Sequence, residues 1–392
     1  MAELATGAWE AQDTTVEVVE HELARILREL NRPAADADGD GDGVVDYPPP
    51  RTSVLNLLVR AEDDAAAERA AALVASLAVR TPSRTLQLFA APDAESDGLD
   101  AAITTHCAIR SDGAAHLCYE QVRLKARGST ALHLASVAEP LIVANLPVIL
   151  WWLGRPPSQH DRLLDLSDRL VVDSDDFADA PAGLSALESC TEAVEGGLEL
   201  GDLGWRRASG WRQLIAQFFD PLDARRYQHQ IRRVTIDYAA TASRTLSAAP
   251  LLLVGWLASR LGWETEHVST ASGSLDGTFM PARDAVVDKT AVTVRVRPRQ
   301  APGTTPGELL AVTLDAGSAR AGEAGGATFE VRWYDSRTCA ATRAVLNGVR
   351  EVARTVPLDR PSTAELLVRE LEATVADPIY AESLARVARL VR

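Results

Sequence analysis

Strand-like and helix-like segments alternate along most of this chain. Apolar runs typical of buried strands lie at residues 53–59, 85–90 and 147–153, and an alanine-rich helix is predicted over 63–79. Because strands that alternate with helices usually build one sheet covered by helices, this order predicts an α/β fold. The same half of the chain carries predicted helices at 14–30 and 136–145 and predicted strands at 101–110, 117–125 and 169–173.

The second half shows the same kind of alternation. Helices are predicted at 184–194, 211–219 and 246–261, and strands at 231–238, 265–268, 291–297, 309–314 and 328–334. Two helices close the chain, because Ser362 and Glu365 form a capping-box pattern and Asp377 precedes Pro378 at a second helix start. We therefore expect two α/β units with mixed sheets flanked by helices, at 1–177 and 178–392, plus N-terminal and C-terminal helices.

Charge and composition exclude several classes of protein. The formal net charge of −15 argues against binding to nucleic acid or to an anionic membrane. No apolar run reaches the roughly 18 residues that span a bilayer, and no secretory signal is visible. The four cysteines form no CxxC pair, so no metal site is expected. We expect a cytoplasmic protein.

Common catalytic motifs are absent. The chain has no GxGxxG before a helix, no GxxxxGK[ST], no HExxH and no GxSxG, and its seven histidines are dispersed. No catalytic residue and no cofactor is therefore predicted. One Gly/Ser loop, Ser272-Gly273-Ser274, is a candidate anion-binding turn, because backbone N–H groups in such turns can hold a phosphate.

An acidic loop at residues 36–47 imitates a calcium-binding loop. Asp36, Asp38 and Asp40 occupy ligand positions, but Tyr47 stands where the bidentate glutamate belongs, and prolines follow. An acidic loop without metal is the favoured interpretation.

Two cysteines are predicted to face each other across a hairpin. Asp112-Gly113 is a favourable two-residue turn, and that turn sets Cys107 opposite Cys118. Directly opposed Cβ atoms lie about 4.5–5.5 Å apart, near disulfide geometry. Two reduced thiols and a redox-sensitive bridge are the alternatives, and reduced thiols are favoured.

The segment 202–220 is the most informative part of the chain. Its apolar residues are spaced as one face of a helix: Trp211, Leu214, Ile215, Phe218 and Phe219. Residues 202–233 hold seven arginines and three aspartates, a local charge of +4 in an acidic chain. Tryptophan and arginine are enriched at interface hot spots, and arginine also binds phosphate, so an acidic partner surface or a phosphorylated ligand would explain the cluster.

This segment resembles the OpcA family of glucose-6-phosphate dehydrogenase assembly proteins, known from actinobacteria and cyanobacteria. The similarity rests on the pattern Asp-Leu-x-Trp-x-Arg, at Asp202 to Arg207, followed by Trp-Arg-x-Leu-x-Ala-Gln-Phe-Phe-Asp, at Trp211 to Asp220. It extends to Arg51-Thr-Ser-Val-Leu-Asn-Leu, Trp151-Trp152 and Asp168-Arg-Leu-Val-Val-Asp, and arginine-rich usage suits an actinobacterial member.

The resemblance implies a non-catalytic partner of glucose-6-phosphate dehydrogenase that promotes its active oligomer or activates it allosterically. That role would support the oxidative pentose phosphate pathway and its NADPH supply. The predicted partner-contacting residues are Trp205, Arg206, Arg207, Trp211 and Arg212. The alternative is an enzyme or sensor that binds a sugar phosphate through an arginine-rich anion site.

Overall fold

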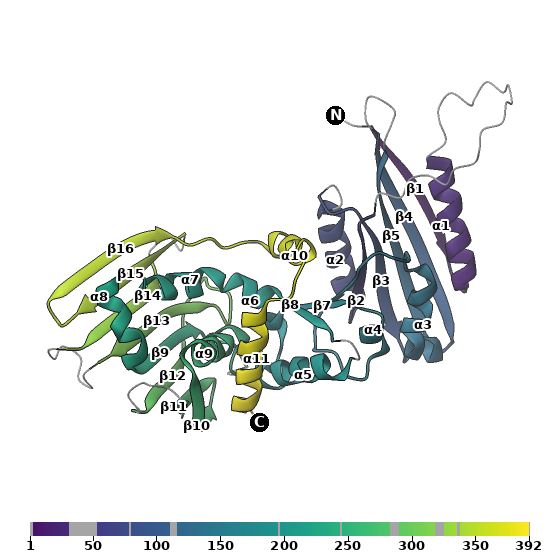
Figure 1. Cartoon of the computed structure of the whole chain (residues 1–392). Helices are drawn as coiled ribbons and strands as arrows, with labels where there is room; N and C mark the ends of the chain where they lie inside the picture. Colours follow the sequence, from purple (N-terminus) through teal and green to yellow (C-terminus); the bar gives the residue numbers. More distant parts are fainter. Residues whose placement is uncertain are drawn as a thin grey trace, which may run out of the picture.

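The computed structural model describes residues 3–30, 53–77, 80–109, 116–194, 197–243, 245–282, 290–317, 325–334 and 338–391. These residues form two eight-stranded sheets in two units, with helices α10 and α11 between them (Figure 1). The fold is mixed α/β, as predicted.

The first unit supplies the elements of the first sheet and its covering helices. In chain order they are β1 (Glu3–Ala11), α1 (Val16–Leu30), β2 (Leu55–Ala61), α2 (Asp64–Leu77), β3 (Ser83–Ala91), β4 (Gly98–Ile109), β5 (His116–Arg127), η2 (Gly128–His133), α3 (Leu134–Ala138), η3 (Glu139–Leu141), β6 (Val148–Trp152), α4 (Arg162–Asp165), β7 (Arg169–Val172), η4 (Ser174–Asp176), α5 (Ala180–Ala193) and β8 (Glu199–Asp202).

The second unit contains a helical segment, the second sheet and the two closing helices. Its elements are α6 (Leu203–Arg207), α7 (Ser209–Gln217), α8 (Leu222–Arg225), η5 (Arg226–Gln230), β9 (Ile231–Ala239), α9 (Ala248–Leu261), β10 (Trp263–Ala271), β11 (Ser274–Pro281), β12 (Val292–Arg299), β13 (Leu309–Ala316), β14 (Ala327–Trp333), β15 (Cys339–Leu346), β16 (Arg350–Pro357), α10 (Thr363–Leu371) and α11 (Pro378–Val391).

Six parallel strands form the body of the first sheet, in the order β5-β3-β2-β6-β7-β8. Strand β4 pairs antiparallel with β5, and β1 pairs antiparallel with β4. In chain order the parallel strands follow the 3-2-1-4-5-6 arrangement of a doubly wound dinucleotide-binding sheet. The winding direction reverses between β2 and β6, so the carboxyl ends of these two strands are where such sheets bind ligands.

Strand β2 shows how the first sheet is covered on both faces. Leu55, Leu57 and Val59 pack with apolar residues of α2 and α10, whereas Leu58 belongs to the larger core that includes α1 and α3. Because successive strand residues point to opposite faces, a strand buried on both sides is mostly apolar, and the buried Asn56 side chain has its hydrogen bonds to backbone groups of Val143 and Leu146.

The second sheet is mostly antiparallel, with β9 and β12 as its parallel pair. On its inner face Val234 and Ile236 are fully buried. The neighbouring outward residues are polar or charged, and Arg233 pairs with Asp315 of the adjacent strand. One face of this sheet is therefore core and the other is a polar surface.

Most predicted elements are confirmed within a few residues, and the differences have local causes. The helix predicted at 136–145 is instead the short series η2, α3 and η3, in which Pro140 stands at a 3-10 helix start and Asn145 has a positive φ of 64°. Strands β1, β8, β11, β15 and β16 were not predicted, because their residues lack a strong apolar alternation. Strands β13 and β14 pair antiparallel, with Ala316 opposite Ala327.

The first sheet extends beyond the boundary expected at residue 177. Strand β8 pairs with β7 and ends at Asp202, and α5 lies between them in the chain. The closing helices begin as predicted. Ser362 and Glu365 form the capping box of α10, and Asp377 Oδ1 accepts hydrogen bonds from the backbone N–H groups of Ile379 and Tyr380.

Candidate functional site

Asp202 anchors the central segment at the carboxyl end of β8. Its Oδ1 accepts hydrogen bonds from the backbone N–H groups of Gly204, at 2.9 Å, and Ser174, at 3.1 Å, and its Oδ2 accepts one from the Tyr380 hydroxyl, at 3.1 Å. The residue is completely buried. Burial raises the pKa of Asp202 to about 6, and the charge of Asp173 acts in the same direction. Asp202 therefore joins β8, η4 and α11 through one carboxyl group.

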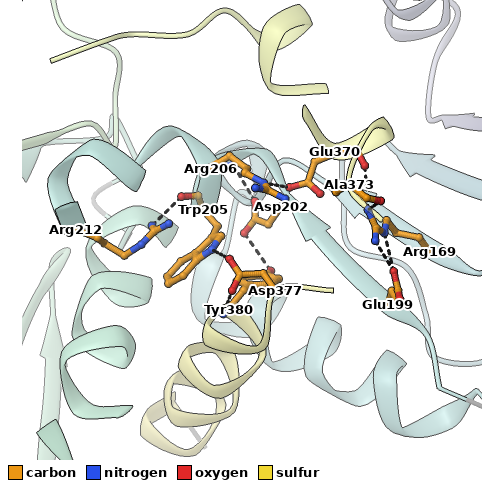
Figure 2. Close-up of polar contacts among 11 residues, drawn as sticks. Arg169, Glu199, Asp202, Trp205, Arg206, Arg212, Glu370, Ala373, Asp377 and Tyr380 are labelled. Atoms are coloured by element: carbon orange, nitrogen blue, oxygen red, sulfur yellow. Dashed lines mark hydrogen bonds and ion pairs between the residues drawn. The ribbon is translucent and has the colours of Figure 1, made fainter. Parts of the chain in front are cut away.

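Trp205 lies one helical turn later and is almost completely buried. Its Nε1 donates to Asp377 Oδ2 at 2.8 Å, and its ring centroid lies 5.4 Å from that of Tyr380 (Figure 2). On the other side, Arg212 Cζ lies 3.3 Å from the ring centroid, and the Arg212 guanidinium donates to the Trp205 carbonyl at 2.8 Å. Burial lowers the pKa of Arg212 to about 10. Trp205 thus holds α6, α7 and α11 together.

Arg206 connects the segment to α10. Its Nε lies 2.5 Å from Oε1 of Glu370, whose side chain is 3% exposed. Arg169 reaches the same helix end from β7, because its guanidinium donates to the carbonyls of Glu370 and Ala373 and pairs with Glu199 (Figure 2). Two arginines therefore fix α10 against the first sheet.

Arg207 lies among carboxylates of η4 and the residue before it. Its NH2 pairs with Asp173 Oδ2 at 2.7 Å, its NH1 donates to Asp173 Oδ1 at 3.0 Å, and it also pairs with Asp175. The Arg207 side chain is 34% exposed. Two parallel N–H···O bonds to Asp173 make this the bidentate geometry that arginine favours.

The apolar face of α7 packs inward. Trp211 and Ile215 are buried, and Trp211 meets Trp333 edge to face, with ring centroids 5.7 Å apart. The partly buried Phe218 and Phe219 rings both contact Phe329 of β14. The predicted helical face is therefore part of the core of the second unit.

All five residues predicted to contact a partner thus have an internal role. Trp205 and Trp211 are buried, Arg212 stacks on Trp205, and Arg206 and Arg207 are each about one-third exposed. Contact between these residues and a partner stays a prediction. Arg206 and Arg207 already have carboxylate partners within this chain.

The Ser272-Gly273-Ser274 loop is the tight turn between β10 and β11. Ser272 and Gly273 have positive φ angles of 49° and 78°, and Ala271 pairs with Ser274. The Gly273 carbonyl accepts a hydrogen bond of 2.6 Å from the Tyr238 hydroxyl. These values identify a two-residue hairpin turn, and anion binding there stays a prediction.

The predicted register of the two cysteines is confirmed. Strands β4 and β5 pair Cys107 with Cys118 and Ile109 with His116. The turn itself and the acidic loop 36–47 lie outside the described residues, so the redox and calcium alternatives stay predictions. The described part of the chain holds no group of three or more His, Cys, Asp or Glu suited to a metal ion.

At the crevice between β2 and β6, an acidic and a basic side chain of the chain itself bond to each other. Glu62 follows β2, and its Oε1 accepts hydrogen bonds from Arg155 Nε, at 2.9 Å, and from the Arg155 backbone N–H, at 3.1 Å, just after β6. Gly154 has a φ of 87°, a left-handed backbone conformation that favours glycine. Asp63 Oδ1 accepts from the Ala66 N–H at 2.6 Å and caps the start of α2.

This crevice has the wrong chemistry for a dinucleotide. A pyrophosphate needs a glycine-rich turn and free N–H groups at the helix start. Here the acidic residues Glu62, Asp63 and Asp64 follow β2 directly, in place of a glycine-rich turn.

A cavity of about 660 Å³ lies between the two units. Carboxylates and guanidiniums line it together with three indole rings. From the first unit and the central segment come Trp151, Leu153, Asp173, Asp175, Asp176, Leu203, Gly204, Arg207, Ala208 and Trp211. From the second unit come Ala249, Thr305, Pro306, Glu308, Leu309, Trp333, Asp359, Arg360, Pro361, Ser362 and Thr363. Below, this hollow is called the inter-unit cleft.

Sequence reasoning missed both the cleft and the network that supports it. Glu370, Asp377 and Tyr380 lie more than 160 residues from the side chains they bind. No local pattern carries that information, although the acidic residues near the chain end were a weak signal for pairing with the arginines.

None of the helices in the described ranges is long and apolar enough to cross a membrane.

Comparison with known families gives matches to both halves of the chain. Residues 74–189 match the family described as the glucose-6-phosphate dehydrogenase subunit N-terminal domain, and residues 198–384 match the corresponding C-terminal domain. Together these two stretches cover most of the chain.

Curated relatives are cyanobacterial proteins named OxPP cycle protein OpcA. The chain is 33% identical to the Nostoc punctiforme protein over 51% of this chain and 42% of that protein. It is 26% identical to the Synechocystis protein over 81% of this chain and 65% of that protein, and 27% identical to the Synechococcus elongatus protein over 83% and 71%. The chain therefore matches less than two thirds of the length of the first two.

Solved structures give only weak similarity. A levoglucosan dehydrogenase bound to NADH and L-sorbose aligns at a TM-score of 0.44 and 10% identity, over 86% of this chain and 94% of that chain. The WlbA dehydrogenase in complex with NADH and UDP-GlcNAcA aligns at 0.33 and 10% identity, over 83% of this chain and 84% of that chain. Similarity at this level says nothing about activity.

Proposed function

This chain belongs to the OpcA family of glucose-6-phosphate dehydrogenase subunit domains, and we propose that it is a non-catalytic partner of glucose-6-phosphate dehydrogenase. It promotes assembly of the enzyme's active oligomer, activates the assembled enzyme allosterically, or does both. Its place would then be the cytoplasm, at the entry to the oxidative pentose phosphate pathway.

The observation that best supports a non-catalytic role is the set of acidic side chains at the crevice between β2 and β6. A dehydrogenase built on this strand order would hold its cofactor there. In this chain the Glu62 carboxylate bonds Arg155 at that position, and the Asp63 side chain accepts the N–H of Ala66 in the first turn of α2. Negative charge at the helix start repels a pyrophosphate, which supports a role without a nicotinamide cofactor at this crevice.

The arginines of the central segment give less support to the alternative of a sugar-phosphate site. Arg206 pairs with Glu370, Arg207 pairs with Asp173 and Asp175, and Arg212 is bonded to Trp205. An arriving phosphate would have to displace a carboxylate that already makes charge-assisted hydrogen bonds.

The test is an activity assay of purified, pre-assembled glucose-6-phosphate dehydrogenase from the same organism, with and without this protein, across a range of glucose 6-phosphate. A shift in apparent substrate affinity identifies an allosteric activator, which needs tighter binding to the active state. Improvement during refolding or co-expression alone identifies an assembly factor. No effect in any of these formats, together with no binding, contradicts the proposal.

A further inference from the structure

The inter-unit cleft is short of positive charge. Five carboxylates and two guanidiniums line it, a net charge of −3. Arg207 is bonded to both Asp173 and Asp175, and Arg360 pairs with Glu308 at 2.5 Å. The carboxylates of Asp176 and Asp359 make no ion pair within the described part of the chain, and both residues are exposed at the rim.

The pKa of a carboxyl group at the cleft agrees with this shortage of positive charge. Burial, followed by the charge of Asp173, raises the pKa of Asp175, whose side chain is 24% exposed. Completely buried Asp202 lies directly behind this group and is held by Ser174. A cation placed among these residues would stabilise their charged forms, whereas an anion would meet net repulsion.

One buried polar atom at the cleft also lacks a partner. Trp151 lines the cleft and is 3% exposed, and its Nε1 donor has no acceptor among the described residues. Buried polar groups normally find a hydrogen-bond partner, so this indole N–H indicates a missing acceptor.

The unpaired carboxylates and the unpaired indole N–H together indicate which kind of ligand fits the cleft. The carboxylates need a donor that carries positive charge, and Trp151 Nε1 needs an acceptor. A metal ion or a polyamine offers only the first, whereas a peptide with a lysine or arginine offers a cationic side chain and main-chain carbonyls. The indole faces of Trp211 and Trp333 add a surface on which a cation is favourable, as Arg360 already shows, 5.5 Å from the Trp333 ring centroid.

We infer that the inter-unit cleft receives a lysine- or arginine-bearing segment of the partner protein. The cationic side chain lies among Asp173, Asp175 and Asp176, with Asp359 on the opposite rim. The cleft volume of about 660 Å³ suits one or two such side chains. In its choice of the dehydrogenase as partner, this inference rests on the proposed function.

The test compares two variants that change the net charge equally. Asp176→Asn/Asp359→Asn removes the unpaired cleft carboxylates, and Glu20→Gln/Glu264→Gln removes two exposed carboxylates, on α1 and β10, away from the cleft. We expect the cleft variant to bind the dehydrogenase about tenfold more weakly, with a smaller salt dependence, and the control to stay within about twofold of the wild type. Equal affinity of wild type and cleft variant overturns the inference and leaves the proposed function intact.

A wild-type protein that does not bind the dehydrogenase at all would reject the proposed function instead. The inference is then decided by tryptophan fluorescence during titration with a seven-residue peptide of alternating glycine and arginine. A saturable change in the wild type that is lost in Asp176→Asn/Asp359→Asn supports it. No change, or an equal change in both proteins, contradicts it.

Discussion

The crevice between β2 and β6 and the inter-unit cleft both lie near carboxyl ends of strands of the first sheet, and they differ in what they hold. Between β2 and β6, Glu62 and Arg155 bond to each other across the position where related sheets hold a cofactor. Between the units, a cleft of about 660 Å³ stays open and keeps carboxylates without cationic partners. The same strand order can therefore lose its cofactor site and keep a recognition site one strand away, because the loops after the strands decide function.

Trp205, which lies behind the inter-unit cleft, is predicted to contribute much more to the free energy of unfolding than the Glu62–Arg155 pair at the crevice. Trp205→Ala removes a buried ring that bonds Asp377 and supports Arg212. The free energy of unfolding should fall by about 3–5 kcal/mol, the usual cost of emptying such a site. Chemical denaturation measures this change. A loss below about 1 kcal/mol would contradict the assignment of Trp205 as the anchor of the cleft wall.

The carboxyl group behind the cleft should make stability depend on pH. Since burial raises the pKa of Asp202 to about 6, the folded state holds a proton that the unfolded state releases near pH 4. This group therefore destabilises the fold progressively as pH rises from about 4 to about 6, by up to roughly 3 kcal/mol, and by a constant amount above that.

Asp202→Asn tests this pH dependence. The difference in unfolding free energy, variant minus wild type, should rise between pH 4 and pH 6 and then level off. A difference that stays flat across this range would show that Asp202 is not buried as described.

The ion pair that holds α10 should have an intermediate effect. Glu370→Gln keeps the shape of a side chain that is 3% exposed but removes the charge facing Arg206. The loss should be about 2 kcal/mol, since a hydrogen bond to a charged group contributes roughly 1.5–3 kcal/mol. Chemical denaturation measures the loss, and Glu372→Gln, at an exposed pair with Arg80, is the matched control with little expected effect.

A substitution at the crevice between β2 and β6 should change the free energy of unfolding least. Arg155→Ala breaks a pair in which the Arg155 side chain is 85% exposed, so stability should change by less than about 1 kcal/mol. The variant should also gain no affinity for NADP⁺ in calorimetry, because Asp63 still caps α2 and three carboxylates remain. Binding of NADP⁺ by the variant would show that Arg155 alone closes a cofactor site.

The crevice was more accessible to sequence reasoning than the cleft. The missing glycine motif after β2 and the acidic run from Glu62 to Asp64 are local features that can be read directly from the sequence. Strand and helix positions also follow local periodicity, as β2 and α7 illustrate. The cleft depends instead on pairings such as Arg206 with Glu370, which only the assembled fold brings together.

The segment Asp202 to Asp220 shows the same limit at residue level. Its spacing predicted an apolar helical face, which the structure places against β14. Three of its arginines were predicted to contact a partner. In the structure Arg212 lies over Trp205, and Arg206 and Arg207 bond carboxylates. Side-chain partners depend on tertiary contacts, so charge alone could not distinguish a binding edge from an internal network.

The contrast between the inter-unit cleft and the crevice is tested most directly by hydrogen–deuterium exchange. Exchange is measured for this protein alone, with NADP⁺ and with glucose-6-phosphate dehydrogenase. The dehydrogenase should slow exchange at residues 173–176 and 359–363 around the cleft. NADP⁺ should leave residues 61–66 and 153–155 at the crevice unchanged. Protection of the crevice by NADP⁺, or a bound dehydrogenase that leaves the cleft rim unprotected, would contradict the account.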